Sequence, residues 1–267
     1  MLKRIGFIGT GNMGAAVASA VYQSGLAGEL WLSNRTAAKA EALAEKLPGA
    51  RVCTNREMVD KCDMIFLGVK PQLMGEVLKE LKEPLVQCRE PRLLVSMAAG
   101  LSCSQLSAML QTTTPWIRMM PNTPVALGRG VVQYCGLYTT QEDMDCFARL
   151  MAPAGLVDRV EERLMDAASC VSGCGPAFAY LFVEALADGG VACGLPRDKA
   201  VEYAAQMLSG SAEMVLNSGS HPGALKDAVC SPGGTTIQGV RALEEAGFRG
   251  AVMDAVIRAY EKTLTLG

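Results

Sequence analysis

Three glycines near the N-terminus have the spacing of a phosphate-binding loop. Gly9, Gly11 and Gly14 follow the pattern G-x-G-x-x-G. In such a loop the first glycine allows a tight turn, the second lets the backbone approach a pyrophosphate, and the third permits close packing of a helix on a strand. The free N–H groups at the start of that helix then face the phosphates. The pattern predicts dinucleotide binding by Gly9, Thr10, Gly11, Asn12, Met13 and Gly14.

The residues about twenty positions further on bear on which dinucleotide is bound. An NAD-specific site usually places Asp or Glu there to accept hydrogen bonds from the ribose, whereas this chain has Ser33-Asn34-Arg35-Thr36. A guanidinium suits a 2′-phosphate, which an acid would repel. We therefore expect Asn34 and Arg35 to contact NADPH, with NADH bound more weakly. The alternative is that Thr36 caps the following helix while Arg35 is only solvated.

A second candidate site lies near the C-terminus, in the run KDAVCSPGGTTIQG at residues 226–239. The pattern is helical on both sides, yet Pro-Gly-Gly interrupts it before Thr235 and Thr236 restart it. Taken locally, the break is either a plain connector or a nest of backbone N–H groups for an anion. A similar break at residues 172–178 places Pro176 at a first helical position, where it either caps the helix or belongs to a site.

The cysteines are expected to form neither a disulfide framework nor a typical metal site. The chain has 10 cysteines and one histidine in 267 residues. The closest pair, Cys170 and Cys174, has only His221 as a possible imidazole partner, and the ligand sets common for zinc need closer pairs or more histidines. We expect no metal ligands, reduced thiols, and a cytoplasmic location without a signal or transit peptide.

The first half of the chain alternates between strand and helix patterns, and these elements must position the glycine loop. Strands are expected from about Lys3 and at residues 29–33, 50–54, 63–71, 92–100 and 115–124. Helices are expected up to about Gly25, over residues 37–47, from about Asn55, up to about Lys82 and from Ser102. Their apolar runs are typical of buried parallel strands, so we expect a doubly wound sheet. Ligands bind beyond the carboxyl ends of such strands, which places residues 69–71, 97–100 and 121–124 along one rim.

The second half is predicted to be almost entirely helical. After a strand at residues 130–135 and a helix from Gln141 to about Met151, helical patterns continue from Glu161 nearly to the end. The stretches at residues 176–194 and 198–219 are apolar over much of their circumference, so we expect another subunit to cover them. The alternative is a compact helical domain that hides its own core. We predict a Rossmann-like domain over residues 1–160 and an all-α dimerisation domain over residues 161–267.

The composition argues against two classes of partner. The chain carries 25 Lys and Arg against 27 Asp and Glu, a net charge of −2, which offers no general attraction for nucleic acid or for an anionic membrane surface. The longest apolar runs are expected to be too short to cross a bilayer.

Taken together, these stretches resemble the pyrroline-5-carboxylate reductase family. The resemblance rests on IGFIGTGNMG, VKP, SMAAG, MPNTP, SGCGPAF, HPGALKD and above all SPGGTTIQGVRALEEAGFR, which occur in the family's order from about Ile5 to Tyr260. It implies an N-terminal Rossmann domain, a C-terminal helical domain that interlocks with a second subunit, and dimers that often assemble into decamers. It also implies NADPH-dependent reduction of the imine of 1-pyrroline-5-carboxylate to L-proline, the last step of proline biosynthesis.

The resemblance also implies roles for particular residues. The cofactor contacts that it adds are Asn34, Asn55, Val69, Lys70, Pro71, Met97, Ala98 and Ala99. The substrate contacts are Glu162, Ser231, Gly233, Gly234, Thr235 and Thr236. Some relatives have Asn in place of Ala228 and Glu-Gln in place of Gly219-Ser220, so one cofactor contact and the local charge near the site differ here.

We expect Thr236 to be the side chain that acts in catalysis. Its hydroxyl can hold the ring nitrogen of the substrate while backbone N–H groups hold the carboxylate. No strong proton donor is apparent, because His221 is expected to cap or bound a turn, so orientation and electrostatics should supply most of the rate. The alternative is that Thr235 or Thr236 only caps the helix.

Two other functions fit parts of the sequence. A related imine reductase or 3-hydroxyacid dehydrogenase has the same plan, and the latter would rely on a catalytic lysine, for which Lys199 and Lys226 are available. A nucleotide-sensing protein that lost catalysis would keep only the cofactor site.

Overall fold

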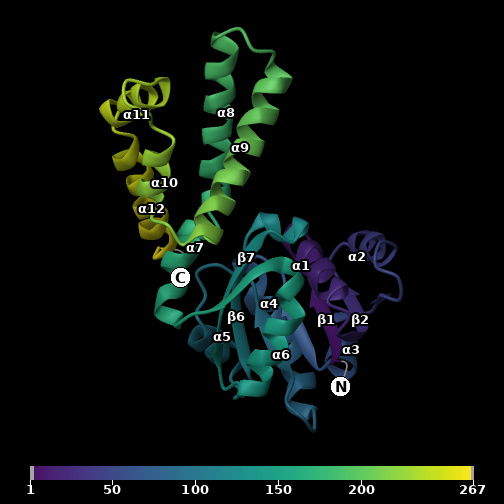
Figure 1. Ribbon diagram of the computed structural model, residues 1–267. Helices are drawn as coiled ribbons and strands as arrows, with labels where there is room; N and C mark the ends of the chain where they lie inside the picture. The colour runs from purple at the N-terminus through teal and green to yellow at the C-terminus, as the bar shows by residue number, and fades with distance from the viewer. Residues whose placement is uncertain (1–2, 266–267) are drawn as a thin grey trace. The chain divides into compact units, whose positions relative to one another are not determined.

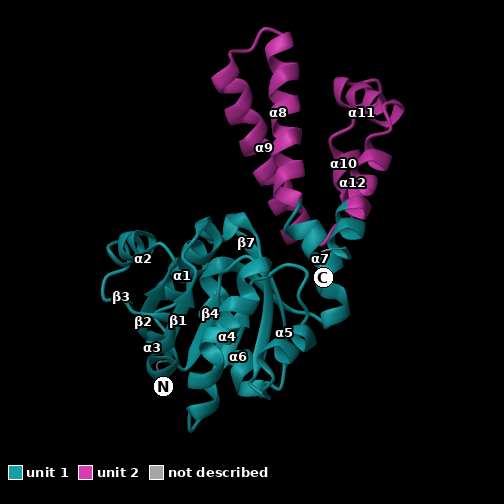
Figure 2. Cartoon of the chain, turned by 180° about the vertical axis from the view of Figure 1, so that it is seen from behind, with its two compact units in different colours: residues 1–174, 259–267 teal, residues 175–258 magenta. Residues whose placement is uncertain are grey.

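The computed structural model describes residues 3–265 and divides into two compact units, which Figure 2 colours separately. Unit 1 comprises Met1–Cys174 with Ala259–Gly267, and unit 2 comprises Gly175–Arg258. The expected boundary after residue 160 stays a prediction. The first stretch of unit 1 extends beyond residue 160 because helix α7 (Glu162–Ser172) packs with this unit. Its Met165 is fully buried there, in the apolar cluster that contains Cys135 of strand β7.

Unit 1 is built on one twisted sheet whose strand order is β3-β2-β1-β4-β5-β6-β7-β8 (Figure 1). The strands are β1 (Lys3–Ile8), β2 (Ala27–Ser33), β3 (Arg51–Val52), β4 (Met64–Leu67), β5 (Leu93–Ser96), β6 (Trp116–Pro121), β7 (Gly130–Leu137) and β8 (Gly155–Arg159). Among the described strands, neighbours run parallel except for the antiparallel pair β6 and β7. The expected doubly wound sheet is confirmed, while β8 was not expected.

Helices connect these strands, and several begin at capping signals that the sequence carries. They are α1 (Asn12–Gln23), α2 (Ala37–Ala44), α3 (Asn55–Lys61), α4 (Pro71–Gln87), α5 (Cys103–Leu110) and α6 (Gln141–Met151), with short 3-10 turns at Thr123–Leu127 and Ala152–Ala154. Reciprocal capping boxes start three of them, with Thr54 and Glu57 before α3, Ser102 and Gln105 before α5, and Thr140 and Asp143 before α6. Helix α4 runs through Pro84 to Gln87, beyond the expected end near Lys82.

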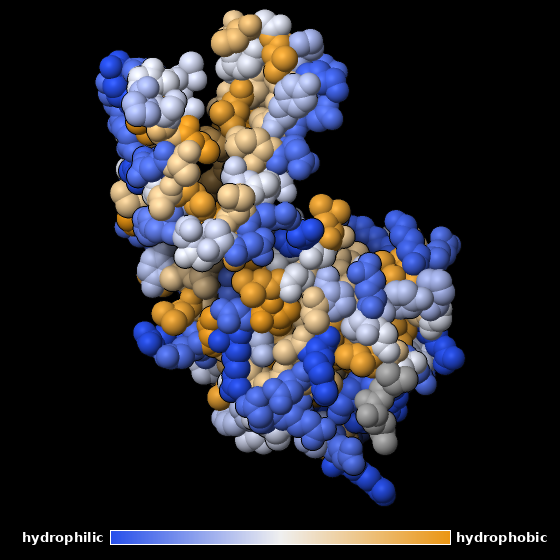
Figure 3. Space-filling model, in the orientation of Figure 1, coloured by the Kyte–Doolittle hydropathy of each residue, from blue (hydrophilic) through white to orange (hydrophobic). Residues whose placement is uncertain are grey.

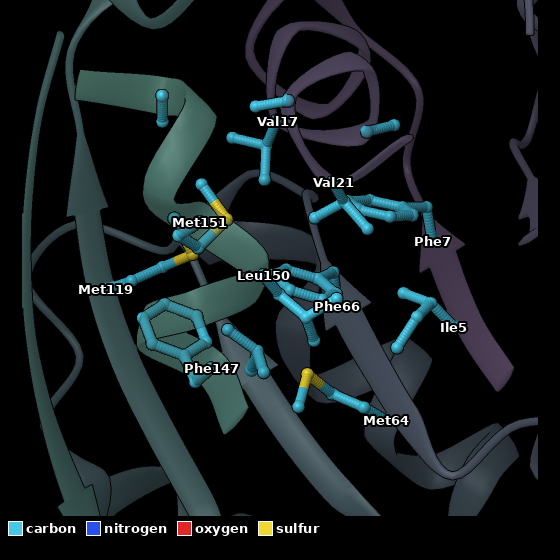
Figure 4. Close-up of a cluster of buried hydrophobic side chains, with 14 of the residues drawn as sticks. Ile5, Phe7, Val17, Val21, Met64, Phe66, Met119, Phe147, Leu150 and Met151 are labelled. Atoms are coloured by element: carbon cyan, nitrogen blue, oxygen red, sulfur yellow. The ribbon is translucent and has the colours of Figure 1, made fainter. Parts of the chain in front are cut away.

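Apolar side chains cover both faces of the sheet. On one face, α1 and α6 pack on the strands, and Figure 4 shows Val17, Val21 and Phe147 meeting Phe7 and Phe66. The rings of Phe7 and Phe66 stack with centroids 4.5 Å apart. On the other face, α3, α4, α5 and α7 bury a second cluster that contains Leu78, Leu106 and Trp116. Successive strand residues alternate between the two clusters, as the pleat requires.

Unit 2 is helical, and its helices leave large apolar side chains exposed. They are α8 (Gly175–Ala192), α9 (Arg197–Ser218), α10 (Pro222–Ala228), α11 (Thr235–Glu245) and α12 (Phe248–Thr263), whose last turn belongs to unit 1. In the described chain, α8 buries only Ala187, and α10, α11 and α12 bury no residue. Orange and tan residues are prominent on these helices in Figure 3. Leu181 is 67% exposed and Leu216 is 79% exposed.

One helical stretch overturns an expectation from the sequence. Glu162–Ala192 spans 31 residues across α7 and α8 and contains a window with a mean hydropathy of 1.4, which is long and apolar enough to cross a membrane by length and composition. The expectation that the apolar runs are too short was therefore wrong, because two adjacent helices join with only a short turn between them. Core helices of soluble proteins can be equally apolar, but they are mostly buried, whereas only 11% of this window is buried within the described residues.

Candidate active site

The glycine loop has the geometry that its spacing predicts. Gly9 follows β1 with φ +96°, and a Cβ there would lie 2.5 Å from the Gly68 carbonyl oxygen. A Cβ on Gly14 would lie 2.0 Å from the Gly9 carbonyl oxygen, so α1 packs tightly against the strand end. A Cβ on Gly11 would meet no atom of the described chain within 4 Å. Gly11 is thus the open position at the N-terminus of α1, where a ligand can approach the backbone.

A buried hydroxyl beside this loop is without a hydrogen-bond partner. Thr10 is 5% exposed, and its Oγ1 makes no hydrogen bond to any described residue. Such a group is costly to leave unpaired, which indicates that something absent from the chain itself pairs with it. A dinucleotide phosphate at the helix start would supply acceptor oxygens there, so the loop fits a dinucleotide.

The side chain of Asn34 is held against the glycine loop. The Thr10 N–H donates to Asn34 Oδ1 at 3.0 Å, and Asn34 Nδ2 donates to the Thr36 carbonyl at 3.0 Å. Thr36 occupies the N-cap position of α2, but its side chain makes no capping hydrogen bond within residues 3–265. Arg35 is exposed. Thr36 therefore occupies the N-cap position that the capping alternative requires, but it does not make the side-chain hydrogen bond that would stabilise the helix.

Arg35 and Asn34 line a recess of about 460 Å³ at the carboxyl end of β2. The recess is lined by Ser33, Asn34, Arg35, Ala37, Val52, Cys53, Thr54, Asn55, Glu57 and Glu80. Ser33 Oγ donates to Asn55 Oδ1 at 2.6 Å, and Asn55 Nδ2 donates to Glu80 Oε2 at 2.8 Å, which fixes the Asn55 amide. Glu80 was not expected here, because it lies on α4 and no local pattern places it near Asn55.

The other acid of the recess, Glu57, is also engaged. It accepts hydrogen bonds from the Thr54 N–H at 2.9 Å and from the Thr54 hydroxyl at 2.8 Å. These bonds, the backbone one foremost, hold the pKa of the Glu57 carboxyl below its usual range. Glu57 and Glu80 therefore both already accept hydrogen bonds from neighbouring residues. Arg35 is the cationic side chain that lines the recess.

The loops after β4 and β5 lie at the same edge of the sheet as the glycine loop. The strands β1, β4 and β5 are parallel neighbours, so Val69-Lys70-Pro71 and Met97-Ala98-Ala99 follow carboxyl ends that lie side by side. A Cβ on Gly68 would lie 2.6 Å from the Gly9 carbonyl oxygen and 3.0 Å from Met97 Cε, which shows how closely the three loops approach. Lys70 is exposed at the N-cap of α4, with Pro71 at the first helical position.

The rim residue Asn122 has a structural role. Its Nδ2 donates to the Ser172 carbonyl at 3.0 Å, and its Oδ1 accepts from the Val131 N–H at 2.8 Å. Asn122 thus ties the end of β6 to β7 and α7, and its amide is already satisfied in this arrangement.

Glu162 begins α7 and lies beside a buried arginine in unit 1. Its Oε1 accepts from the Cys103 N–H at 2.6 Å, which satisfies one N–H group at the N-terminus of α5, and lies 3.8 Å from Arg118 Nη1. Arg118 is 3% exposed and also pairs with Asp166, one turn along α7. The contacts of Glu162 therefore connect α7, α5 and β6.

The loop at residues 231–236 forms a sharp turn before α11 in unit 2. Gly233 has φ +69°, and the Gly234 N–H donates to the Ser231 carbonyl at 3.0 Å. Gly234 is the N-cap of α11, and a Cβ there would lie 2.3 Å from Ser231 Oγ. Thr235 and Thr236 are the first two exposed residues of the helix, and the described chain has no side-chain capping bond at this helix. The capping alternative for the two threonines was therefore wrong.

The remaining candidates for proton transfer are engaged elsewhere. His221 is the N-cap of α10, and its Nδ1 accepts from the Gly223 N–H at 3.0 Å, so the expected capping role is confirmed. Lys199 pairs with Glu202 at 2.7 Å, and Lys226 pairs with Asp227. The ion pair raises the pKa of Lys226 above its ordinary value, so this lysine is a poor proton acceptor at neutral pH.

Two family models match the chain, one over each half. Residues 162–266 match a family described as pyrroline-5-carboxylate reductase dimerisation, and residues 4–100 match one described as NADP oxidoreductase coenzyme F420-dependent. A pyrroline-5-carboxylate reductase from Escherichia coli is 41% identical over 266 residues, which cover 98% of each chain.

Solved structures agree with this similarity. A pyrroline carboxylate reductase from Plasmodium falciparum, solved with NADP bound, has a TM-score of 0.88 and 33% identity over 99% of this chain and 98% of its own. A 3-hydroxyisobutyrate dehydrogenase from Mycobacterium tuberculosis covers 83% of this chain and 72% of its own, with a TM-score of 0.54 and 14% identity, and therefore shares the fold alone.

Proposed function

The chain belongs to the pyrroline-5-carboxylate reductase family, and from that premise we propose how its residues carry out the NADPH-dependent reduction of 1-pyrroline-5-carboxylate to L-proline. The observation that carries this function is a similarity that extends over nearly the whole chain and therefore includes the residues of both units. The chain is an NAD(P)H-dependent oxidoreductase that acts on a C=N bond, in the last step of proline biosynthesis.

The cofactor site in this proposal is the edge of the sheet at which β1, β2, β4 and β5 end. When bound, NADPH supplies the hydride that reduces the imine carbon. The N-terminus of α1 and the Thr10 hydroxyl bind the pyrophosphate, and Arg35 pairs with the 2′-phosphate beside Asn34. The fixed amide of Asn55 contributes to the same recess. Residues 69–71 and 97–99 contact the rest of the nucleotide.

The substrate carboxylate in this proposal binds the start of α11. The turn directs the first N–H groups of the helix outward, and the partial positive charge of a helix N-terminus favours an anion. The Gly234 N–H already donates to the Ser231 carbonyl. The N–H groups of Thr235, Thr236 and Ile237, the first three helical residues, are therefore the donors that remain at the helix start. Gly233 and Gly234 shape the turn, and Ser231 closes it.

Thr236 orients the ring nitrogen of the substrate. Its hydroxyl is exposed and unused for capping, so it can accept from a protonated iminium or donate to the neutral imine. The iminium is the better hydride acceptor, so a hydroxyl that favours the protonated nitrogen accelerates the reaction. Orientation and electrostatics provide the catalysis, because His221, Lys199 and Lys226 are all engaged elsewhere. Glu162 is a further substrate contact that the family resemblance implies.

One assay separates this function from its alternatives. NADPH oxidation is measured with 1-pyrroline-5-carboxylate, and NADP reduction is measured with 3-hydroxyacids. We expect turnover in the first reaction and none in the second. Turnover of a 3-hydroxyacid would favour a dehydrogenase that uses Lys199 or Lys226. Tight NADPH binding with no turnover in either direction would favour a nucleotide sensor.

The exposed apolar helices of unit 2 suit a second copy of the chain. The family model that matches this region describes dimerisation, and a partner helix would cover side chains such as Leu181 and Met253. The same cover accounts for the apolar stretch at Glu162–Ala192 without a membrane. We infer a homodimer through the C-terminal helices that assembles further into a decamer, located in the cytoplasm and binding no nucleic acid.

A further inference from the structure

Two cysteines and a glutamate meet in the interior of unit 1. Cys103 is the first residue of α5, Cys135 lies in β7, and Glu162 is the first residue of α7. The two sulfur atoms and a carboxylate oxygen of Glu162 all lie within 4.8 Å of one another. Cys103 is fully buried, and Cys135 is 5% exposed. Three elements that are far apart in sequence thus bring three metal-ligating atoms to one point.

The two cysteines are buried residues of one apolar cluster. Cys103 and Cys135 both belong to the cluster that also contains Trp116 and Met165. Both cysteines are free, so no disulfide joins them. The pair therefore offers two sulfur atoms beside one carboxylate.

We propose that Cys103, Cys135 and Glu162 form a binding site for a thiophilic divalent cation, with Zn²⁺ as the natural occupant. Cysteine sulfur binds zinc at about 2.3 Å and carboxylate oxygen at about 2.0–2.2 Å, so neighbouring ligand atoms in a tetrahedral site lie about 3.5–3.8 Å apart. Atoms that already lie within 4.8 Å of one another reach this spacing by small side-chain rotations. A water molecule completes the coordination.

The charges around the cluster are compatible with a bound dication. The buried guanidinium of Arg118 already pairs with the carboxylates of Glu162 and Asp166. Metal binding releases a proton from each thiol, and the exchange of two protons for one dication leaves the net charge of the buried group unchanged. The existing bond from the Cys103 N–H is no obstacle, because a carboxylate offers about four lone-pair sites.

Occupation of the site would restrain Glu162. This consequence rests on the proposed function, in which Glu162 lies near the substrate. The binding of the metal ion itself does not depend on that function. Cys103 also follows the loop at residues 97–102, which contains the proposed cofactor contacts Met97, Ala98 and Ala99. A cation held by α5, β7 and α7 would fix this loop and the Glu162 carboxylate together. We expect Zn²⁺ to inhibit the reductase reversibly.

The binding test uses the reduced full-length chain and Cd²⁺, whose thiolate complexes absorb in the ultraviolet. We expect one Cd²⁺ per chain with a two-thiolate absorption, and a loss of affinity of at least about tenfold in Cys103→Ser and in Cys135→Ser. Cys193→Ser is the matched control, because Cys193 is exposed and outside the cluster. Titrations of the two cluster variants that coincide with that of the control would overturn the site.

A second measurement avoids any variant that fails to fold. The unsubstituted protein is treated with a small alkylating reagent in partial denaturant, with and without Zn²⁺, and the modified cysteines are identified by mass spectrometry. Selective protection of Cys103 and Cys135 supports the site, and equal protection of all cysteines contradicts it. Zn²⁺ inhibition that is at least about tenfold weaker in Cys135→Ser supports the link to catalysis, while undiminished inhibition in that variant overturns it. The absorption and protection results hold even if 1-pyrroline-5-carboxylate proves not to be the substrate.

Discussion

Thr236 is the side chain on which the proposed substrate site depends most. It is exposed at the start of α11 and does not cap the helix in the described chain. We predict that Thr236→Ala lowers kcat/KM for 1-pyrroline-5-carboxylate by about 10- to 100-fold, the size of a lost hydrogen bond to a charged group. Steady-state kinetics with saturating NADPH measure the effect.

Two further variants separate this role from a structural one. Thr236→Ser keeps the hydroxyl and should retain most of the activity. The melting temperature of Thr236→Ala should stay within a few degrees of that of the parent, because no capping bond is lost. A variant that melts much earlier and recovers its activity on addition of stabilising ligands would indicate that Thr236 acts on the helix and not on the substrate.

Arg35 is the residue that should distinguish the two cofactors. It is exposed and lines the recess beside Asn34. The two acids of that lining, Glu57 and Glu80, already accept hydrogen bonds from other residues. We predict that Arg35→Glu raises KM for NADPH by about 100-fold or more, since a pairing charge is replaced by a repelling one. The KM for NADH should change by less than about threefold. Parallel measurements with both cofactors decide the matter, and an equal rise in the two KM values would contradict recognition of the 2′-phosphate.

At the scale of the β1–α1 turn, two glycines should respond to alanine in opposite ways. Gly11 has φ −70° and open space at its Cβ position, so Gly11→Ala should fold normally and weaken NADPH binding by about tenfold or more. Gly14→Ala should destabilise unit 1 by about 1–3 kcal/mol or more, because its Cβ would lie 2.0 Å from the Gly9 carbonyl oxygen. Thermal melts and NADPH titrations of both variants test the contrast. Two variants that lose binding while melting alike would refute it.

Local signals along the chain determine where several helices of unit 1 begin. Thr54, Ser102 and Thr140 each start a helix with a reciprocal capping box, and the glycine spacing identified the β1–α1 turn. Strand β8 was missed, because its residues Gly155–Arg159 are largely exposed and have no apolar pattern of a strand. The segment is a strand because it pairs with β7. Helix α4 passes through Pro84, which tertiary packing tolerates because Leu81 and Leu85 are buried on either side.

The candidate site was predictable only where its residues are close in sequence. The glycine loop and the turn at residues 231–236 are continuous stretches, so composition and spacing reveal them. Glu80 lies on α4, 25 positions after Asn55 in the sequence, and no periodic pattern predicts that the two side chains meet in the recess. The approach of Cys103, Cys135 and Glu162 could not be predicted for the same reason, since the three residues are far apart in the sequence. The expectation of no metal ligands stays a prediction, against which the proposed cation site can be tested.

At the scale of the whole molecule, unit 2 cannot account for its own apolar surface. Its helices α8 and α12 contact through Phe182 and Phe248, with ring centroids 5.8 Å apart, and border an apolar recess of about 460 Å³. Phe178, Leu181 and Val252 line that recess. An exposed patch of this kind on a chain of 267 residues is typical of a permanent subunit interface. The stability of such helices then depends on the concentration of the protein, because association and folding are coupled.

A charge placed in this recess should therefore dissociate the assembly. The chain mass is 28.2 kDa, and light scattering of the parent should give a multiple of it, at least a dimer. We predict that Leu181→Glu shifts the mass toward one chain and lowers the melting temperature, since a buried unpaired carboxylate is strongly unfavourable. Val86→Glu is the matched control, because Val86 is 64% exposed on α4 of unit 1 and lies outside the proposed interface. A parent that scatters as a single chain, or a Leu181→Glu variant that keeps the parent mass, would mean that another partner covers these helices.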